Sequence, residues 1–223
     1  VMWDNLPDYT DGKNAIVIAD TSGSMTWNGG LPMAVSVSLA LYFAERNKGA
    51  FNGSFMTFSA SPSIINVKKE KSLQEKFNDI SRADWGNNTD LIKAFELILG
   101  VAERENIPAE EMPETIYVIS DMEFDEANGN RWGNDGILGK TNHEVIKEKY
   151  QKAGYEIPRI VYWNVDSKQD NVPVEKNELG VALISGFSPT AFKLAIDENA
   201  TPMSFMLDTI NTERYKDVEK LFK

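Results

Sequence analysis

The sequence predicts an α/β fold in which a mostly parallel sheet of about six strands lies between two layers of helices. Three observations lead to this prediction. Short apolar runs typical of buried strands recur along the chain, longer segments with helical periodicity separate most of them, and helix caps mark several boundaries. Strands that alternate with helices in this way form a doubly wound, Rossmann-like sheet covered on both faces.

The first half of the chain contains three expected strands and three expected helices. Residues 1–13 are polar and turn-rich and form a lead-in, after which the run NAIVIA predicts a buried strand. Pro32 suits the first turn of a helix, and Ser72 with Glu75 forms a capping box. The expected strands are 14–19, 53–59 and 63–67, and the expected helices are 33–47, 72–80 and 90–105.

The second half continues the alternation after a glycine-rich loop at 122–140. Trp163 stands in an apolar run and is expected in the core. His143 lies near the start of a charged helix and is expected at the surface. Three residues near the C-terminus (Met203, Phe205 and Met206) are expected to pack. The expected strands are 115–120, 158–165 and 181–186, and the expected helices are 141–154, 188–198 and one or two within 202–222.

Length and composition indicate one domain over residues 1–223. We expect a core at 14–200 and a C-terminal helical extension at 201–223. The 42% hydrophobic content is ordinary for a globular protein with a substantial core. Neither a transmembrane run nor a signal-peptide pattern is found. The chain starts at Val1, which suggests a piece excised from a longer protein.

The charge and the cysteine count narrow the classes of function. The sequence has no cysteine, which excludes disulfides, thiolate metal sites and cysteine nucleophiles and fits the reducing cytoplasm. The formal charge of −11 argues against direct nucleic-acid binding by this domain, because phosphate neutralisation dominates that affinity. It suits cation binding better, although solubility alone also explains an acidic balance.

Oxygen-bearing side chains gather at the expected strand ends. Asp20, Ser22 and Ser24 follow the first buried strand at alternate positions, and Gly23 between them is expected to permit a tight turn. Thr89 stands in a polar loop, and Asp121 closes a later buried strand. Ligands of doubly wound sheets bind beyond the carboxyl ends of the strands. Hydroxyl and carboxylate oxygens suit Mg²⁺, with Mn²⁺ or Ca²⁺ as alternatives, so the sequence predicts a divalent-cation site.

The Asp-x-Ser-x-Ser run at 20–24, with the later threonine and aspartate, resembles the von Willebrand factor A (vWA) family and its metal-ion-dependent adhesion site (MIDAS). The resemblance covers roughly 14–200. It implies that Ser22 and Ser24 bind the ion directly, that Thr89 does so in one state, and that Asp20 and Asp121 act partly through water. It also implies outer positions for two further residues, Asn88 and Glu123. Met122 replaces the glycine that the family carries after its aspartate.

Two branches of the vWA family are most similar to this chain. It resembles the A-like domain of Ro-type RNA-binding proteins. The stretches SDMEFD, VYWNV and SGFS, at 120–125, 161–165 and 185–188, also look like the C-terminal part of an uncharacterised family of intracellular and phage-associated proteins. In both branches the domain follows a separate region, which agrees with the expectation of a longer chain.

The resemblance implies a module that binds a protein partner through the ion, whose coordination an acidic residue of the partner completes. An alternative is a metal-dependent, phosphohydrolase-like enzyme with Asp20 as nucleophile. Against it, the aspartate expected two residues later in such enzymes is replaced by Ser22. A further alternative is a scaffold domain in a ribonucleoprotein whose RNA-binding region lies elsewhere in the chain. We expect no membrane partner.

Overall fold

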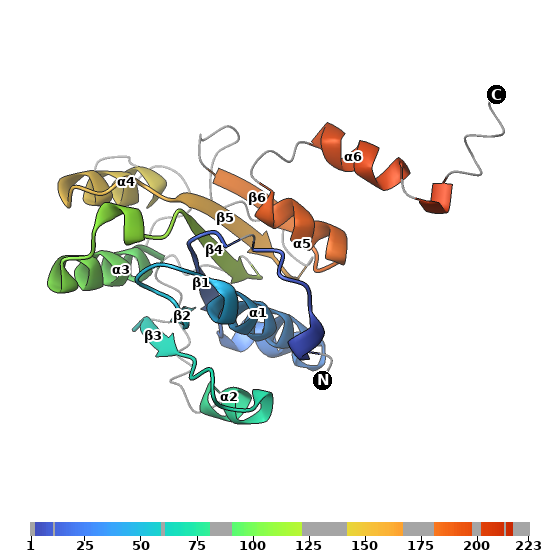
Figure 1. Ribbon diagram of the computed structural model, residues 1–223, viewed down its shortest axis with the longest axis horizontal. Coiled ribbons are helices and arrows are strands. Elements are labelled where there is room, and N and C mark those ends of the chain that lie inside the picture. Colours follow the sequence, from blue (N-terminus) through green and yellow to red (C-terminus); the bar gives the residue numbers. More distant parts are fainter. Residues whose placement is uncertain are drawn as a thin grey trace.

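The structure is a computed structural model that describes residues 3–10, 12–58, 61–80, 91–121, 142–166, 181–197, 202–211 and 213–215. Its centre is a six-stranded sheet in the order β3-β2-β1-β4-β5-β6 (Figure 1). Only β3 runs antiparallel to its neighbour, so the mostly parallel sheet predicted from the sequence is confirmed. The strands are β1 Ala15–Asp20, β2 Ser54–Phe58, β3 Ser63–Asn66, β4 Thr115–Ser120, β5 Arg159–Asn164 and β6 Val181–Ser185.

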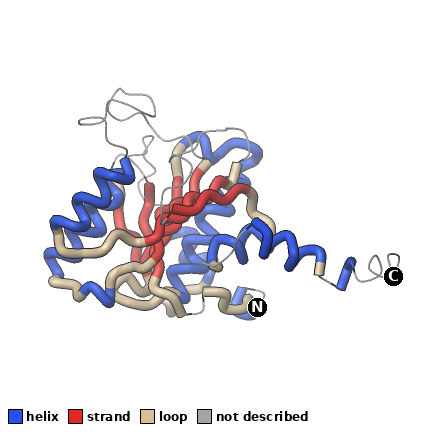
Figure 2. Tube along the Cα trace, turned by 90° about the horizontal axis from the view of Figure 1, so that it is seen from above, coloured by secondary structure: helices blue, strands red, loops and turns tan. Residues whose placement is uncertain are grey.

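Helices cover both faces of this sheet (Figures 1 and 2). One face packs on α1 and α5, and the other packs on α3 and α4. The helices are α1 Trp27–Arg46, α2 Leu73–Ile80, α3 Leu91–Glu105, α4 Asn142–Lys152, α5 Pro189–Ile196 and α6 Pro202–Ile210. Short 3₁₀ turns lie at Trp3–Asn5, Gly23–Thr26, Ala109–Glu111 and Glu213–Tyr215.

The apolar run of β1 divides between the two cores. Val17 and Ala19 face the core under α1, whereas Ile16 and Ile18 face the core under α3 and α4. A strand buried on both faces needs apolar residues at every position, which is why this run does not alternate with polar residues. The predicted core position of Trp163 is confirmed, since it is 1% exposed.

The predicted boundaries of two helices rest on observed caps. At the start of α2, the backbone N–H of Ser72 donates to Oε2 of Glu75 at 2.8 Å, and the N–H of Glu75 donates to the hydroxyl of Ser72 at 3.4 Å. This is the reciprocal pair of a capping box. Ser188 caps α5 by accepting from the N–H of Ala191 at 3.1 Å.

The first turn of α1 is broken. Asn28, Gly29 and Gly30 have φ of 51°, 70° and 78°, all in the left-handed region. Regular helix therefore begins after them, close to Pro32, in agreement with the predicted start at 33. The break separates the loop that follows β1 from the body of α1.

Two predicted surroundings are wrong. His143 was expected at the surface but is only 8% exposed, because the start of α4 packs against the protein. Met203 and Met206 were expected to pack, but α6 projects away from the sheet and leaves them 60% and 47% exposed (Figures 1 and 2). The side chain of Phe205, for which the same was expected, lies outside the described part of the structure. Within the described ranges, no helix combines the length and the apolar character needed to cross a membrane.

Candidate metal centre

The candidate centre lies where the strand order reverses. After β1 the chain adds β2 and β3 on one side of it and then crosses to add β4 on the other side. The parallel neighbours β1 and β4 therefore send their following segments in opposite directions, which leaves a crevice position between their carboxyl ends. Asp20 is the last residue of β1, and Asp121 follows the last residue of β4. This is the position at which doubly wound folds bind ligands, so the fold brings together the two carboxylates that the sequence singled out.

Asp20 is fully buried and held at both carboxylate oxygens. The backbone N–H of Ser22 donates to Oδ1 at 2.8 Å, and the hydroxyl of Ser120 donates to Oδ2 at 2.5 Å. Asp20 and Ser120 are both 0% exposed. The contact with Ser22 closes a short turn at the end of β1 and directs the chain into the serine-containing loop.

The surroundings of Asp20 disfavour its negative charge. Burial raises the pKa of Asp20 to about 6, and the neighbouring Asp121 carboxylate acts in the same direction, while the hydrogen bonds from Ser120 and Ser22 oppose the rise. A carboxylate with a raised pKa at a strand end is typical of a functional site. A cation at this place would favour the ionised form.

Ser22 and Ser24 present their hydroxyls to each other, with the two Oγ atoms 2.9 Å apart. Ser22 is 5% exposed, and Ser24 is partly buried. The loop between them is a 3₁₀ turn in which the N–H of Met25 donates to the carbonyl of Ser22 at 3.1 Å. The Met25 side chain is 0% exposed and anchors this turn in the core. The short turn and the buried Met25 therefore hold the two hydroxyls close together.

The tight turn predicted at Gly23 is present as the 3₁₀ turn Gly23–Thr26, but its backbone does not need a glycine. The φ of Gly23 is not among the positive values, so the turn does not require a glycine. A Cβ at this position would meet no described atom within 4 Å. Among the described residues, the space next to Gly23 is therefore open.

The donors at this site suit a hard divalent cation. Asp121 is 5% exposed beside the buried Asp20. Among the described residues, no three His, Cys, Asp or Glu side chains gather to hold a metal. An ion at the ends of β1 and β4 would therefore depend on serine hydroxyls and water as well as carboxylates, as Mg²⁺ permits. Thr89, Asn88 and Glu123 lie outside the described residues.

Sequence reasoning placed Ser120 at the strand end beside Asp121 but gave its side chain no role. Ser120 is the last residue of β4, and only the alignment of β4 with β1 shows that its hydroxyl reaches Asp20. A polar residue also ends β5 and β6, in register with it, at Asn164 and Ser185. In the sequence, the pattern that could have indicated Ser120 is the polar residue that ends each of the apolar runs of β4, β5 and β6.

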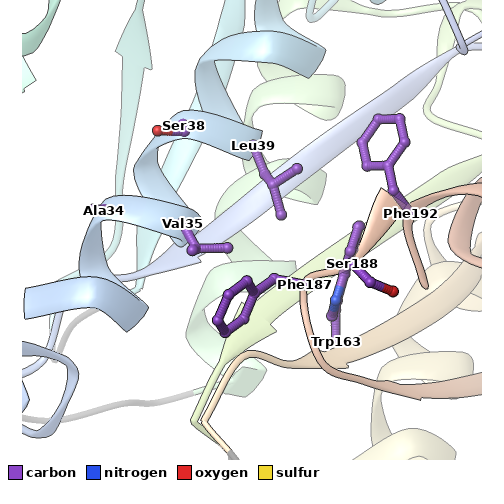
Figure 3. Close-up of a pocket in the computed structure, with 8 residues that line it drawn as sticks. All are labelled: Ala34, Val35, Ser38, Leu39, Trp163, Phe187, Ser188 and Phe192. Carbon is purple, nitrogen blue, oxygen red and sulfur yellow. The ribbon is translucent and has the colours of Figure 1, made fainter. Parts of the chain in front are cut away.

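A separate pocket of about 380 Å³ lies between α1 and the start of α5 (Figure 3). Most of its lining is apolar, with Val35 and Leu39 on one side and Trp163, Phe187 and Phe192 on the other. Among the residues that the structure describes, no charged side chain lines it. This pocket does not suit an ion, and the candidate centre stays at the ends of β1 and β4.

Comparison with known proteins identifies relatives of the whole domain. Residues 14–220 match the family described as "Domain of unknown function (DUF7788)". "Uncharacterized protein L728" of Acanthamoeba polyphaga mimivirus is 31% identical over 214 residues, which are 93% of this chain and 36% of the viral protein. The chain thus spans about a third of the length of this curated relative.

Two solved structures share the fold. The Deinococcus radiodurans RO (RSR) protein has a TM-score of 0.58 at 17% identity, over 87% of this chain and 35% of that chain. Proximal thread matrix protein 1 from the mussel byssus, "with zinc occupied MIDAS motif", has a TM-score of 0.52 at 15% identity, over 83% of this chain and 47% of that chain. The predicted vWA-like fold, similar to that of the Ro protein, is confirmed. With its sheet order and its match over 14–220, the chain belongs to the DUF7788 family and has a vWA-like fold.

Proposed function

We propose that the protein is a divalent-cation-dependent module that binds a protein partner. The ion, Mg²⁺ or alternatively Mn²⁺ or Ca²⁺, would be held by five residues, and an acidic side chain of the partner would complete its coordination. Asn88 and Glu123 would support the ligands from outside. The five are Asp20, Ser22, Ser24, Thr89 and Asp121.

The observation that carries the proposal is the pair of serine hydroxyls, 2.9 Å apart, beside the buried carboxylate of Asp20. Hydroxyl ligands are neutral, so a cation held mainly by them keeps much of its positive charge. Such a centre supplies an electrophilic position that attracts a carboxylate from another molecule. A solved structure with the same fold carries zinc at a motif of this name, which supports the assignment.

We propose a binding role and not an enzymatic one. Asp20 is 0% exposed, so its carboxylate is poorly placed to reach the phosphorus atom of a substrate. Ser22 stands where the aspartate expected of such a phosphatase would lie and cannot act as its general acid. We expect no turnover of p-nitrophenyl phosphate with Mg²⁺.

The charge of the domain favours a protein over a nucleic acid as direct partner. At −11, the chain would repel phosphates unless a separate basic region were attached. RNA would then be bound only by the rest of a longer chain, with this domain as a scaffold. We place the protein in the cytoplasm, because a chain without cysteine suits a reducing compartment.

The proposal can be tested with Mn²⁺ as a paramagnetic probe. Water bound to Mn²⁺ on the protein speeds the relaxation of bulk water protons, and a carboxylate that replaces this water lowers the effect. We expect a short peptide with one glutamate to lower it and the matched glutamine peptide to leave it unchanged. The Ser22→Ala/Ser24→Ala variant is the control and should show no enhancement. Equal effects of the two peptides would contradict the proposal.

A further inference from the structure

We infer that Ser120 is a positioning residue of the candidate centre, which holds the carboxylate of Asp20 in one orientation toward the ion and its water shell. The inference rests on the proposed function and adds a residue that the Asp-x-Ser-x-Ser motif does not contain. The hydroxyl of Ser120 donates to Oδ2 of Asp20 at 2.5 Å. Both side chains are 0% exposed, so no bulk water can take the place of this donor.

Two bonds are needed to fix a carboxylate. The last torsion of an aspartate side chain is broad, so a bond to one oxygen leaves the plane of the group free to turn. The N–H of Ser22 holds Oδ1 at 2.8 Å, and the hydroxyl of Ser120, on the neighbouring strand β4, holds Oδ2. A carboxylate has about four lone-pair positions, so each oxygen of Asp20 can still accept one more bond from a water of the ion.

The alignment of β1 with β4 is what places Ser120 there. Ala19 pairs with Ile119, so the next residues along, Asp20 and Ser120, stand side by side at the carboxyl edge. In register with them, Asn164 and then Ser185 continue the row across β5 and β6. Within this row, the hydroxyl of Ser120 contacts Asp20 and so connects the candidate metal centre at the end of β1 to strand β4.

The test compares the ion affinities of Ser120 variants by calorimetry on metal-stripped protein. Ser120→Ala removes the donor, and Ser120→Cys replaces it with a weak donor of similar size. Loss of a residue that orients a metal ligand typically weakens ion binding by about 10–100-fold, and we expect this for Mg²⁺ and Mn²⁺ with both variants. Ser120→Thr returns a hydroxyl and should restore most of the affinity.

Ser36 offers a matched control. It is also 0% exposed, and its hydroxyl donates to β4 as well, to the carbonyl of Ile119 at 3.3 Å, but not to a carboxylate. Ser36→Ala should therefore leave the affinity within about twofold of the wild type, since it removes no bond to a ligand. A loss caused only by a disturbed core would appear in both alanine variants.

A second readout needs no metal. In metal-free protein, Ser120→Ala should lower the urea midpoint of unfolding. The same substitution in the Asp20→Asn background should shift the midpoint by at most half as much, because the stability effects of two contacting residues are not additive. Wild-type affinity in Ser120→Ala and Ser120→Cys, with equal midpoint shifts in both backgrounds, would overturn the inference and leave the proposed function standing. A folded wild type that binds neither ion would contradict the proposed function and, with it, the role of Ser120 toward an ion.

Discussion

The carboxylate of Asp20 lies where its charge is costly without a cation. Raising the pKa of a fully buried group from 3.8 to about 6 corresponds to a cost of roughly 3 kcal/mol for the ionised form. Asn has the same shape and no charge, and its amide can still accept from Ser22. We therefore predict that Asp20→Asn stabilises the metal-free protein at pH 7 by up to about 3 kcal/mol while abolishing ion binding. Urea unfolding in chelator measures the first effect, and a less stable variant would contradict the prediction.

The same group predicts a pH dependence. The pKa of Asp20 is higher in the folded than in the unfolded chain, so its contribution is fully present below about pH 4 and is lost as the pH rises to about 6. The difference in unfolding free energy between Asp20→Asn and wild type should therefore grow over this range and stay level above it. The measurement is urea unfolding of both proteins, without metal, at several pH values. A difference that is constant from pH 4 to 7 would rule this out.

At the scale of elements, Gly23 and Gly30 lie between the end of β1 and the regular part of α1 and differ in backbone conformation. Gly30 has φ of 78°, a region that costs an L-residue roughly 1–2 kcal/mol, whereas Gly23 has no positive φ and open space around it. Gly30→Ala should therefore lower the unfolding free energy by about 1 kcal/mol. Gly23→Ala should leave it unchanged or raise it by up to about 1 kcal/mol, because alanine restricts the unfolded chain. Thermal unfolding of the pair measures this contrast, and the reverse order would contradict the backbone account.

The elements of this fold were largely predictable from the sequence. Buried parallel strands such as β1 and β4 appear as continuous apolar runs, and the cap of α2 at Ser72 is a local signal that the structure repeats. The position of Asp20 at the switch point also followed from the alternation of strands and helices.

Properties that depend on packing between distant elements were not predictable. The charged sequence around His143 indicates a surface position, yet its side chain is only 8% exposed, while Glu144 beside it is exposed. Ser120 acquires its contact only through the pairing of β1 with β4, which no local pattern specifies. The turn expected at Gly23 is present, but its φ is not positive, so the turn does not depend on a glycine. The assignment of Thr89, Asn88 and Glu123 stays a prediction.

At the scale of the whole molecule, the described apolar side chains of α6 contribute little to the core. The apolar face of this helix remains 43–60% exposed, and the helix extends away from the sheet (Figure 1); the face consists of Met203, Met206, Leu207 and Ile210. The division into a core at 14–200 and an extension at 201–223 stays a prediction. Deleting 201–223 should change the unfolding free energy by less than about 1 kcal/mol, because exposed surface substitutions and losses cost little. A loss of several kcal/mol in urea unfolding would place the extension within the core.

The central claim concerns the molecule as a receptor for a cation and, through it, for an acidic partner. The most direct test is calorimetric titration of the metal-stripped protein with Mg²⁺, Mn²⁺ and Ca²⁺, with Ser22→Ala/Ser24→Ala as control. We predict saturable binding at one site in the wild type and none in the variant, because the two hydroxyls are ligands. Equal binding by a folded variant, or no binding by the folded wild type, would contradict the metal centre at the ends of β1 and β4.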